Sequence, residues 1–153
     1  MNVLVSACLL GTECKYNQGS NESEQVKQLL EEHHLIPVCP EIMGGLPTPR
    51  TPAEVRGEKV ITKDGKDVTA EFQKGAGEAL RLAELYGCRC AVLKEKSPSC
   101  GSGNIYDGTF TGTLTSSDGV TAKLLKKHGI HVFGENMPCL REVLHEKGND
   151  NEI

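Results

Sequence analysis

Short apolar runs alternate with amphipathic segments along this chain, and the alternation constrains the possible folds more than any other feature. Four runs rich in Val, Ile, Leu or Ala predict strands at residues 2–7, 35–38, 90–94 and 130–133. Apolar residues at helical spacing predict helices near residues 21–33, 68–86, 120–128 and 138–147. Strands that alternate with helices indicate a mostly parallel sheet joined by right-handed crossovers.

The fold class that we expect is α/β. It is a single domain with a mostly parallel, short-stranded sheet and helices on both faces, as in Rossmann-like and flavodoxin-like proteins. A chain of 153 residues favours one core. We expect the domain to cover residues 1–147 and a polar tail to cover 148–153. Pro37 either weakens the strand prediction at 35–38 or places that strand at an edge of the sheet, because proline lacks the N–H of a central strand.

Two segments predict long loops, where binding and catalytic residues often lie. Residues 40–54 contain four prolines and two glycines, which predicts that no helix forms there. Residues 97–119 are rich in Ser, Gly, Thr and Asp. Between these loops, residues 59–62 predict a short strand that is followed by an Asp64-Gly65 turn.

The net charge of −4 argues against a nucleic-acid polymer as partner, because such a partner requires a basic surface. A nucleobase or nucleoside stays open as a small-molecule ligand. No stretch approaches the ~20 apolar residues of a membrane span, and the opening residues lack the basic start of a secretory signal. We therefore expect a cytoplasmic protein without membrane association, whose oligomeric state stays open.

Seven cysteines are many for such a chain, and they predict a thiol-dependent site rather than disulfides. An odd number without a secretory signal argues against a disulfide framework. The absence of any C-x-x-C spacing disfavours zinc ribbons, thioredoxin-type motifs and ferredoxin-type runs. The roles that remain for these cysteines are metal binding, catalysis or packing in the core.

Three of the cysteines follow predicted strands, so they should meet at the carboxyl edge of the sheet. Cys8 and Cys39 directly follow the first two strands, and Cys100 lies a few residues after the third. Three thiolates suit zinc, copper(I) or an iron–sulfur cluster and leave one coordination position open. The alternative is that each is a small buried apolar residue. The other cysteines do not share this placement: Cys14, Cys88, Cys90 and Cys139.

The motifs around these cysteines resemble a bacterial family of thiouracil desulfidases, formerly grouped as a domain family of unknown function. The resemblance runs from residue 2 to about residue 133. Its motifs are SACLLG (6–11), VCPEIMGGLPTPR (38–50), KDGKDVT (63–69), LKEKSPSCGSG (93–103) and YDGTFTGT (106–113).

This resemblance implies a [4Fe-4S] cluster with three cysteine ligands, which are Cys8, Cys39 and Cys100, and with one open iron. It implies a catalytic carboxylate at Glu41 and a catalytic serine in SPS, where we favour Ser97. Within the same motifs, we expect these residues to contact the substrate: Ser99, Arg50, Gly44 and Gly45. The residue types alone leave a capping carboxylate, turn serines and a surface arginine as alternatives.

The expected reaction is a hydrolytic, non-redox desulfidation of a thiolated pyrimidine. The open iron would bind the thiocarbonyl sulfur, Glu41 would take a proton from water, and Ser97 would position the base. We expect burial and the cluster's negative charge to raise the pKa of Glu41. Two other classes stay open: a zinc- or cluster-binding structural or regulatory module, and a sulfur carrier without hydrolytic activity.

Overall fold

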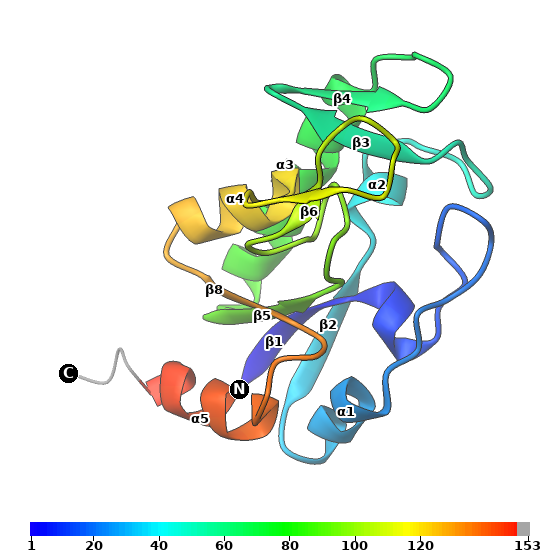
Figure 1. Cartoon of the computed structure of the whole chain (residues 1–153). Coiled ribbons are helices and arrows are strands. Elements are labelled where there is room, and N and C mark those ends of the chain that lie inside the picture. The colour runs from blue at the N-terminus through cyan, green and yellow to red at the C-terminus, as the bar shows by residue number, and fades with distance from the viewer. Residues whose placement is uncertain (150–153) are drawn as a thin grey trace.

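A computed structural model describes residues 1–149, and the last four residues of the predicted tail lie outside the described residues. One parallel sheet forms the centre, in the strand order β2-β1-β5-β8 (Figure 1). Its strands are β1 (Asn2–Ser6), β2 (His34–Val38), β5 (Cys90–Leu93) and β8 (His131–Gly134). The predicted parallel sheet is confirmed, and Pro37 lies on the edge strand β2.

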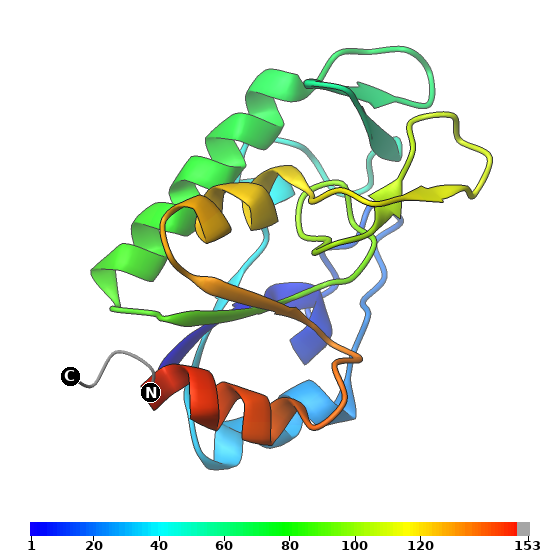
Figure 2. The same cartoon turned by 60° about the vertical axis from the view of Figure 1, so that its left-hand side comes forward.

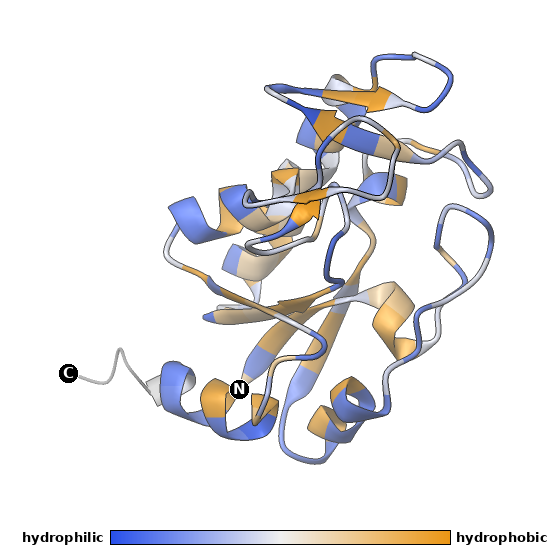
Figure 3. Ribbon diagram, in the orientation of Figure 1, coloured by the Kyte–Doolittle hydropathy of each residue, from blue (hydrophilic) through white to orange (hydrophobic). Residues whose placement is uncertain are grey.

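Helices cover both faces of this sheet, as the alternating pattern predicts (Figures 1 and 2). On one face lie α3 (Thr69–Leu85) and α4 (Val120–Lys127). On the other lie α5 (Leu140–Asn149), α1 (Glu24–Lys27) and the 3-10 turn Gln28–Glu31 that continues α1. Neighbouring residues of β1 serve opposite cores: Leu4 packs in the α3–α4 core, and Val3 and Val5 in the α1–α5 core. Figure 3 shows this apolar character of the strands.

The ends of several elements differ from the predicted ones. The first helix begins at Glu24 because the Ser23 side chain, rather than that of Asn21, accepts the Val26 N–H at 3.3 Å. Residues 28–31 continue it only as a 3-10 turn. The fourth strand of the sheet and the last helix each begin one or two residues later than predicted.

The prediction of no helix in residues 40–54 is wrong, because α2 (Pro40–Met43) forms one turn there. Proline is tolerated at the first position of a helix, where its missing N–H has no intrahelical partner. The same segment ends in β3 (Ala53–Arg56), which pairs antiparallel with the predicted strand β4 (Lys59–Thr62). In the second predicted loop, β6 (Ile105–Tyr106) and β7 (Leu114–Thr115) form another short hairpin.

Two glycines allow α2 to cross α3 at very short distance. A Cβ atom built on Gly44 would lie 1.9 Å from the Glu71 carbonyl oxygen, and one built on Gly75 would lie 1.8 Å from the Pro40 carbonyl oxygen. Real atoms cannot approach so closely, so only glycine fits at both positions. This contact fixes α2 and therefore Cys39, which is its N-cap residue.

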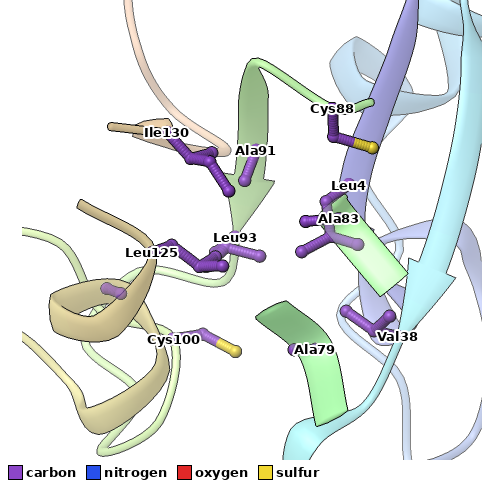
Figure 4. Packing of buried hydrophobic residues seen from close by; sticks show 11 residues of the cluster. Leu4, Val38, Ala79, Ala83, Cys88, Ala91, Leu93, Cys100, Leu125 and Ile130 are labelled. Atoms are coloured by element: carbon purple, nitrogen blue, oxygen red, sulfur yellow. The ribbon is translucent and has the colours of Figure 1, made fainter. Parts of the chain in front are cut away.

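The strand order creates a switch point beside β1. The chain leaves β1 for β2 on one side and later reaches β5 on the other side. Ligands of open α/β sheets bind beyond the carboxyl ends of the strands at such a point. Figure 4 shows Cys88 and Cys100 at opposite ends of β5, with Cys100 beyond its carboxyl end.

Candidate active site

A cavity of about 540 Å³ opens at the carboxyl edge of the sheet, where the three sequence-predicted cysteines meet. Its walls come from the ends of β1, β2 and β5 and from the two hairpins. The lining residues with reactive or charged side chains include Cys8, Cys14, Cys39, Cys100, Glu41, Arg50, Lys94 and Ser97. The cavity therefore combines soft sulfur ligands with groups that can move or donate protons.

Each predicted ligand is placed by a short turn that follows its strand. Cys8 lies in the 3-10 turn Ala7–Leu10 directly after β1, and Gly11 ends that turn at a φ of 101°. Cys39 follows β2 as the N-cap of α2. Cys100 follows β5 in a turn in which its N–H donates to Ser97 Oγ at 3.0 Å. Rigid strands thus hold all three thiols.

Cys14 also lines this cavity, which the sequence analysis did not predict. Its buried thiol is hydrogen-bonded to both Cys8 and Cys39. The Cys39 thiol is also 3.8 Å from the Cys14 carbonyl oxygen. The sequence did carry a signal for this position of Cys14. Cys14 lies in the loop that follows the first strand, and that loop starts at the same edge of the sheet as Cys8.

The hydrogen bonds among these thiols favour two thiolates. Hydrogen bonding from Cys14 is the main cause that lowers the pKa of Cys39 to about 6, and the Ile42 N–H and the Arg50 charge act in the same direction. Cys14 likewise lowers the pKa of Cys8 to about 7, with help from Asn21 and the Lys94 charge. The same hydrogen bonds raise the pKa of Cys14.

Cys100 lies in a different environment. Burial raises the pKa of its thiol to about 12, although a hydrogen bond with the Ser6 hydroxyl acts in the opposite direction. Ser6 is itself buried, and its Oγ accepts the Lys94 N–H at 2.9 Å. A bound metal would favour the Cys100 thiolate, because a coordinating thiol loses its proton.

The donor set fits an iron–sulfur cluster. Cysteine thiolates are the usual protein ligands of such clusters, and Cys8, Cys39 and Cys100 line one cavity. A cluster with three cysteine ligands takes each thiolate at a separate iron, so thiols from three separate segments of the chain suit it.

Glu41 and Arg50 form a largely buried ion pair in the wall of the cavity. Arg50 Nε donates to Glu41 Oε1 at 3.1 Å, and the two side chains are 7% and 19% exposed. The Arg50 guanidinium also donates to the carbonyl oxygens of Cys14 and Pro47 and to the Thr48 hydroxyl. Burial raises the pKa of Glu41, and the Arg50 charge partly offsets that effect. The raised pKa of Glu41 agrees with the prediction from the sequence, whereas its ion pair with Arg50 was not predicted.

The two serines of the SPS motif have different surroundings. Ser97 lines the cavity, and its Oγ accepts the N–H groups of Ser99 at 3.1 Å and Cys100 at 3.0 Å. Both lone pairs of this oxygen are thereby used, so its hydroxyl proton is available to a ligand. Ser99 is buried, and its hydroxyl is 2.7 Å from that of Thr121. Of the two serines, Ser97 is therefore the one that can contact a molecule in the cavity.

The other predicted substrate contacts are distributed differently. Arg50 lines the cavity, but its guanidinium is occupied by the partners described above. Gly44 is buried in the crossing of α2 and α3, and Gly45 follows α2 at a φ of 102°. Neither glycine nor Ser99 is among the residues that line the cavity. These positions support the walls of the site.

The remaining cysteines lie away from the cavity. Cys88 and Cys90 are buried in the two cores at the amino end of β5, and Cys139 is exposed. A larger hollow of about 1030 Å³ opens at that amino edge, but no cysteine lines it. None of the helices within residues 1–149 has the length and apolar run needed to cross a bilayer.

Comparison with known proteins agrees with this geometry. A family model described as 2-thiouracil desulfurase matches residues 3–137. Uncharacterized protein YbbK of Bacillus subtilis (strain 168) is 44% identical over 144 residues, which cover 88% of this chain and 95% of that protein. A solved structure of TudS, a [4Fe-4S]-dependent thiouracil desulfidase, superposes with a TM-score of 0.88 at 49% identity and covers 95% of this chain and 98% of that one. The chain therefore belongs to the 2-thiouracil desulfurase family.

Proposed function

We propose that this protein is a [4Fe-4S]-dependent desulfidase that converts the thiocarbonyl of a thiolated pyrimidine to a carbonyl by hydrolysis. The observation that carries the proposal is that Cys8, Cys39 and Cys100 line one cavity together with Glu41 and Ser97. The family match and the likeness to TudS support the substrate class and the cofactor.

Cys8, Cys39 and Cys100 would hold the cluster. When bound, a cluster with three cysteine ligands supplies one iron that can act as a Lewis acid toward a soft thiocarbonyl sulfur. The lowered thiol pKa values of Cys8 and Cys39 favour the thiolates that bind iron. Lys94, held by Glu135 Oε2 at 3.0 Å, places a positive charge close to Cys8.

Glu41 is the general base in this proposal. Its Oε1 is held by Arg50, which leaves Oε2 to take a proton from the water that attacks the ring carbon. Burial raises its pKa toward the working pH, where a carboxylate transfers protons most effectively. The same group then returns the proton to the ring nitrogen or to the leaving sulfide, so no net redox change is needed.

Ser97 supplies the second protein group. Because its oxygen already accepts two N–H groups, its O–H proton is left to donate to the ligand. A donor fixed in this way stabilises the negative charge that develops when water adds to the base. The turn that holds Ser97 also holds Cys100, so proton donor and cluster ligand move as one unit.

The proposal includes the cellular setting. The substrate is a free base or nucleoside in the cytoplasm, and neither a nucleic-acid polymer nor a membrane is a partner. The net charge of −4 supports the exclusion of a polymer. A reducing compartment suits a cavity lined by free thiols that hold iron.

The test is sulfide release from 2-thiouracil by anaerobically purified protein, normalised to bound iron. We expect sulfide and uracil in equal amounts, with the new carbonyl oxygen derived from labelled water. Protein that carries the cluster but releases no sulfide would contradict the proposal and favour a carrier. Protein that binds zinc but no iron would favour the structural module.

A further inference from the structure

Aromatic side chains gather at the candidate active site. The chain has only three Phe, three Tyr and no Trp. Tyr16, Tyr106 and Phe110 line the cavity that holds the cysteines. Half of the Phe and Tyr residues of the chain therefore line one cavity, where their flat rings can contact a bound molecule.

Phe110 adopts a backbone conformation that is uncommon for a bulky residue. It lies in the turn between β6 and β7 at a φ of 57°, in the left-handed region. Side chains with a Cβ visit this region rarely, and surrounding contacts must hold them there. Such a conformation at the wall of a cavity points to a functional side chain rather than to a packing one.

Strand β3 holds this turn from the side. The Glu54 carboxylate accepts the N–H groups of Gly108 at 3.0 Å and of Phe110 at 3.1 Å. The Arg56 guanidinium donates twice to the Gly108 carbonyl oxygen, at 2.7 and 3.2 Å. Figure 2 shows the two hairpins side by side above the sheet. Four charge-assisted hydrogen bonds thus fix the backbone on both sides of Thr109.

The turn between β6 and β7 packs so closely against β3 that its backbone has little conformational freedom. A Cβ atom at Gly108, which has a φ of 93°, would lie 2.8 Å from the Val55 carbonyl oxygen. Within the turn, the Thr109 N–H and hydroxyl donate to Asp107 Oδ1. The turn is therefore built as a rigid support, and the side chain that it presents to the cavity is Phe110.

We propose that Phe110 stacks on the pyrimidine ring of the substrate and that Glu54 and Arg56 are positioning residues that hold it there. This inference rests on the proposed function and deepens it, because it assigns the ring-binding surface of the site. Stacking depends on the face of the bound ring and not on its edge. The Phe110 ring therefore selects flat heteroaromatic thiones but tolerates different substituents at the edge of the substrate ring.

Steady-state kinetics with 2-thiouracil tests the proposal. For Phe110→Ala we expect the KM to rise at least about 5-fold with little change in kcat per iron, because stacking binds ground state and transition state alike. Phe110→Tyr should retain the wild-type KM. Glu54→Ala should raise the KM in the same direction, and Glu54→Gln, whose amide oxygen can still accept both N–H groups, should largely restore it.

Leu114→Ala is the matched control, because Leu114 lies in the same hairpin, is 41% exposed and does not line the cavity. Its KM should stay at the wild-type value. An unchanged KM for Phe110→Ala in active enzyme overturns the stacking role and leaves the proposed function intact. Wild-type protein without sulfide release would instead contradict the proposed function.

Fluorescence gives a second readout that needs no turnover. The F110W variant would carry the only tryptophan of the chain, so its emission should be quenched when 2-thiouracil binds. The Y86W variant is the control, because Tyr86 is exposed and does not line this cavity. Equal quenching in both variants would contradict stacking at residue 110.

Discussion

At the scale of single residues, Glu41 is subject to two opposing influences. Burial raises its pKa, and the adjacent Arg50 cation lowers it. A buried carboxylate without a partner would stay protonated, and an exposed one would be too weak a base at neutral pH. The ion pair keeps the pKa between these limits, which suits a group that must accept and return a proton.

Glu41→Gln tests this role directly. The amide preserves the shape and can accept a hydrogen bond from Arg50, but it cannot take a proton from water. We expect the variant to keep its iron and to lose ~10²-fold or more of its turnover, the size typical of general acid–base catalysis. The measurement is sulfide release per bound iron. A variant with lower stability and near-normal turnover would make Glu41 a structural capping residue.

Arg50→Met tests the influence of the cation. Removal of the positive charge disfavours the carboxylate, so the pKa of Glu41 should rise further. A general base works only above its pKa, so the acid limb of the pH–rate profile should move to higher pH. The loss of rate should then be greatest at low pH and partly recovered at high pH. Arg50→Lys should move the limb less, and an equal loss at every pH would contradict this account.

The chemistry of these residues was only partly predictable from the sequence. The meeting of Cys8, Cys39 and Cys100 in one cavity was predictable because each follows a strand, and strand ends meet at one edge of a parallel sheet, whereas their proposed role as cluster ligands came from the family resemblance. The hydrogen bonds of Cys14 and the pairing of Arg50 with Glu41 were not predictable. Both depend on how loops fold back over the edge, and side-chain periodicity carries no information on loops.

At the scale of elements, the crossing of α2 over α3 places Cys39, which we propose as a cluster ligand. The two helices meet through Gly44 and Gly75, and each glycine faces a backbone carbonyl of the other helix. The short helix α2 has only four residues and cannot form by itself. Its position therefore depends on α3, a long helix that packs on the central sheet.

Gly75→Ala should disturb that position. The added Cβ would collide with the Pro40 carbonyl, so we expect a loss of about 2 kcal/mol of stability and a lower iron content. Gly77→Ala is the matched control two residues along α3, because a Cβ atom there meets nothing within 4 Å. Alanine is the better helix former by about 1 kcal/mol, so the control should be slightly more stable and keep its iron. Equal iron content in both variants would remove the crossing from the account of the site.

At the scale of the whole molecule, the central sheet and the helices on its faces followed from the sequence, whereas of the two small hairpins only strand β4 did. Residues 3–5 of β1 and 90–93 of β5 are buried on both faces of the sheet and are unbroken apolar runs, which predict strands. The hairpins β3–β4 and β6–β7 are short and mostly half-exposed, so they leave little hydrophobic pattern. Their pairing depends on specific contacts such as that of Glu54 with the turn before β7.

The two edges of the sheet carry different sets of cysteines, and this leads to a prediction about their roles. Cys8, Cys39 and Cys100 line the cavity at the carboxyl edge. Cys88 and Cys90 are buried at the amino end of β5, on either side of the sheet. A cluster that ties together three separate segments needs every one of its thiolates, because each holds a different iron. Packing thiols are replaceable by small apolar side chains.

Alanine substitution at each of these five cysteines, followed by anaerobic reconstitution and iron analysis, separates the two groups. We expect the Cys8, Cys39 and Cys100 variants to lose most of their iron and all of their desulfidase activity. The Cys88 and Cys90 variants should keep the wild-type ratio of iron to protein, even where the small cavity that alanine leaves in the core lowers the unfolding temperature. The ratio is taken on folded protein after size-exclusion chromatography, so reduced yield does not count as lost iron. Loss of iron from a Cys88 or Cys90 variant alone, with Cys8, Cys39 and Cys100 variants still loaded, would place the cluster at the amino edge instead.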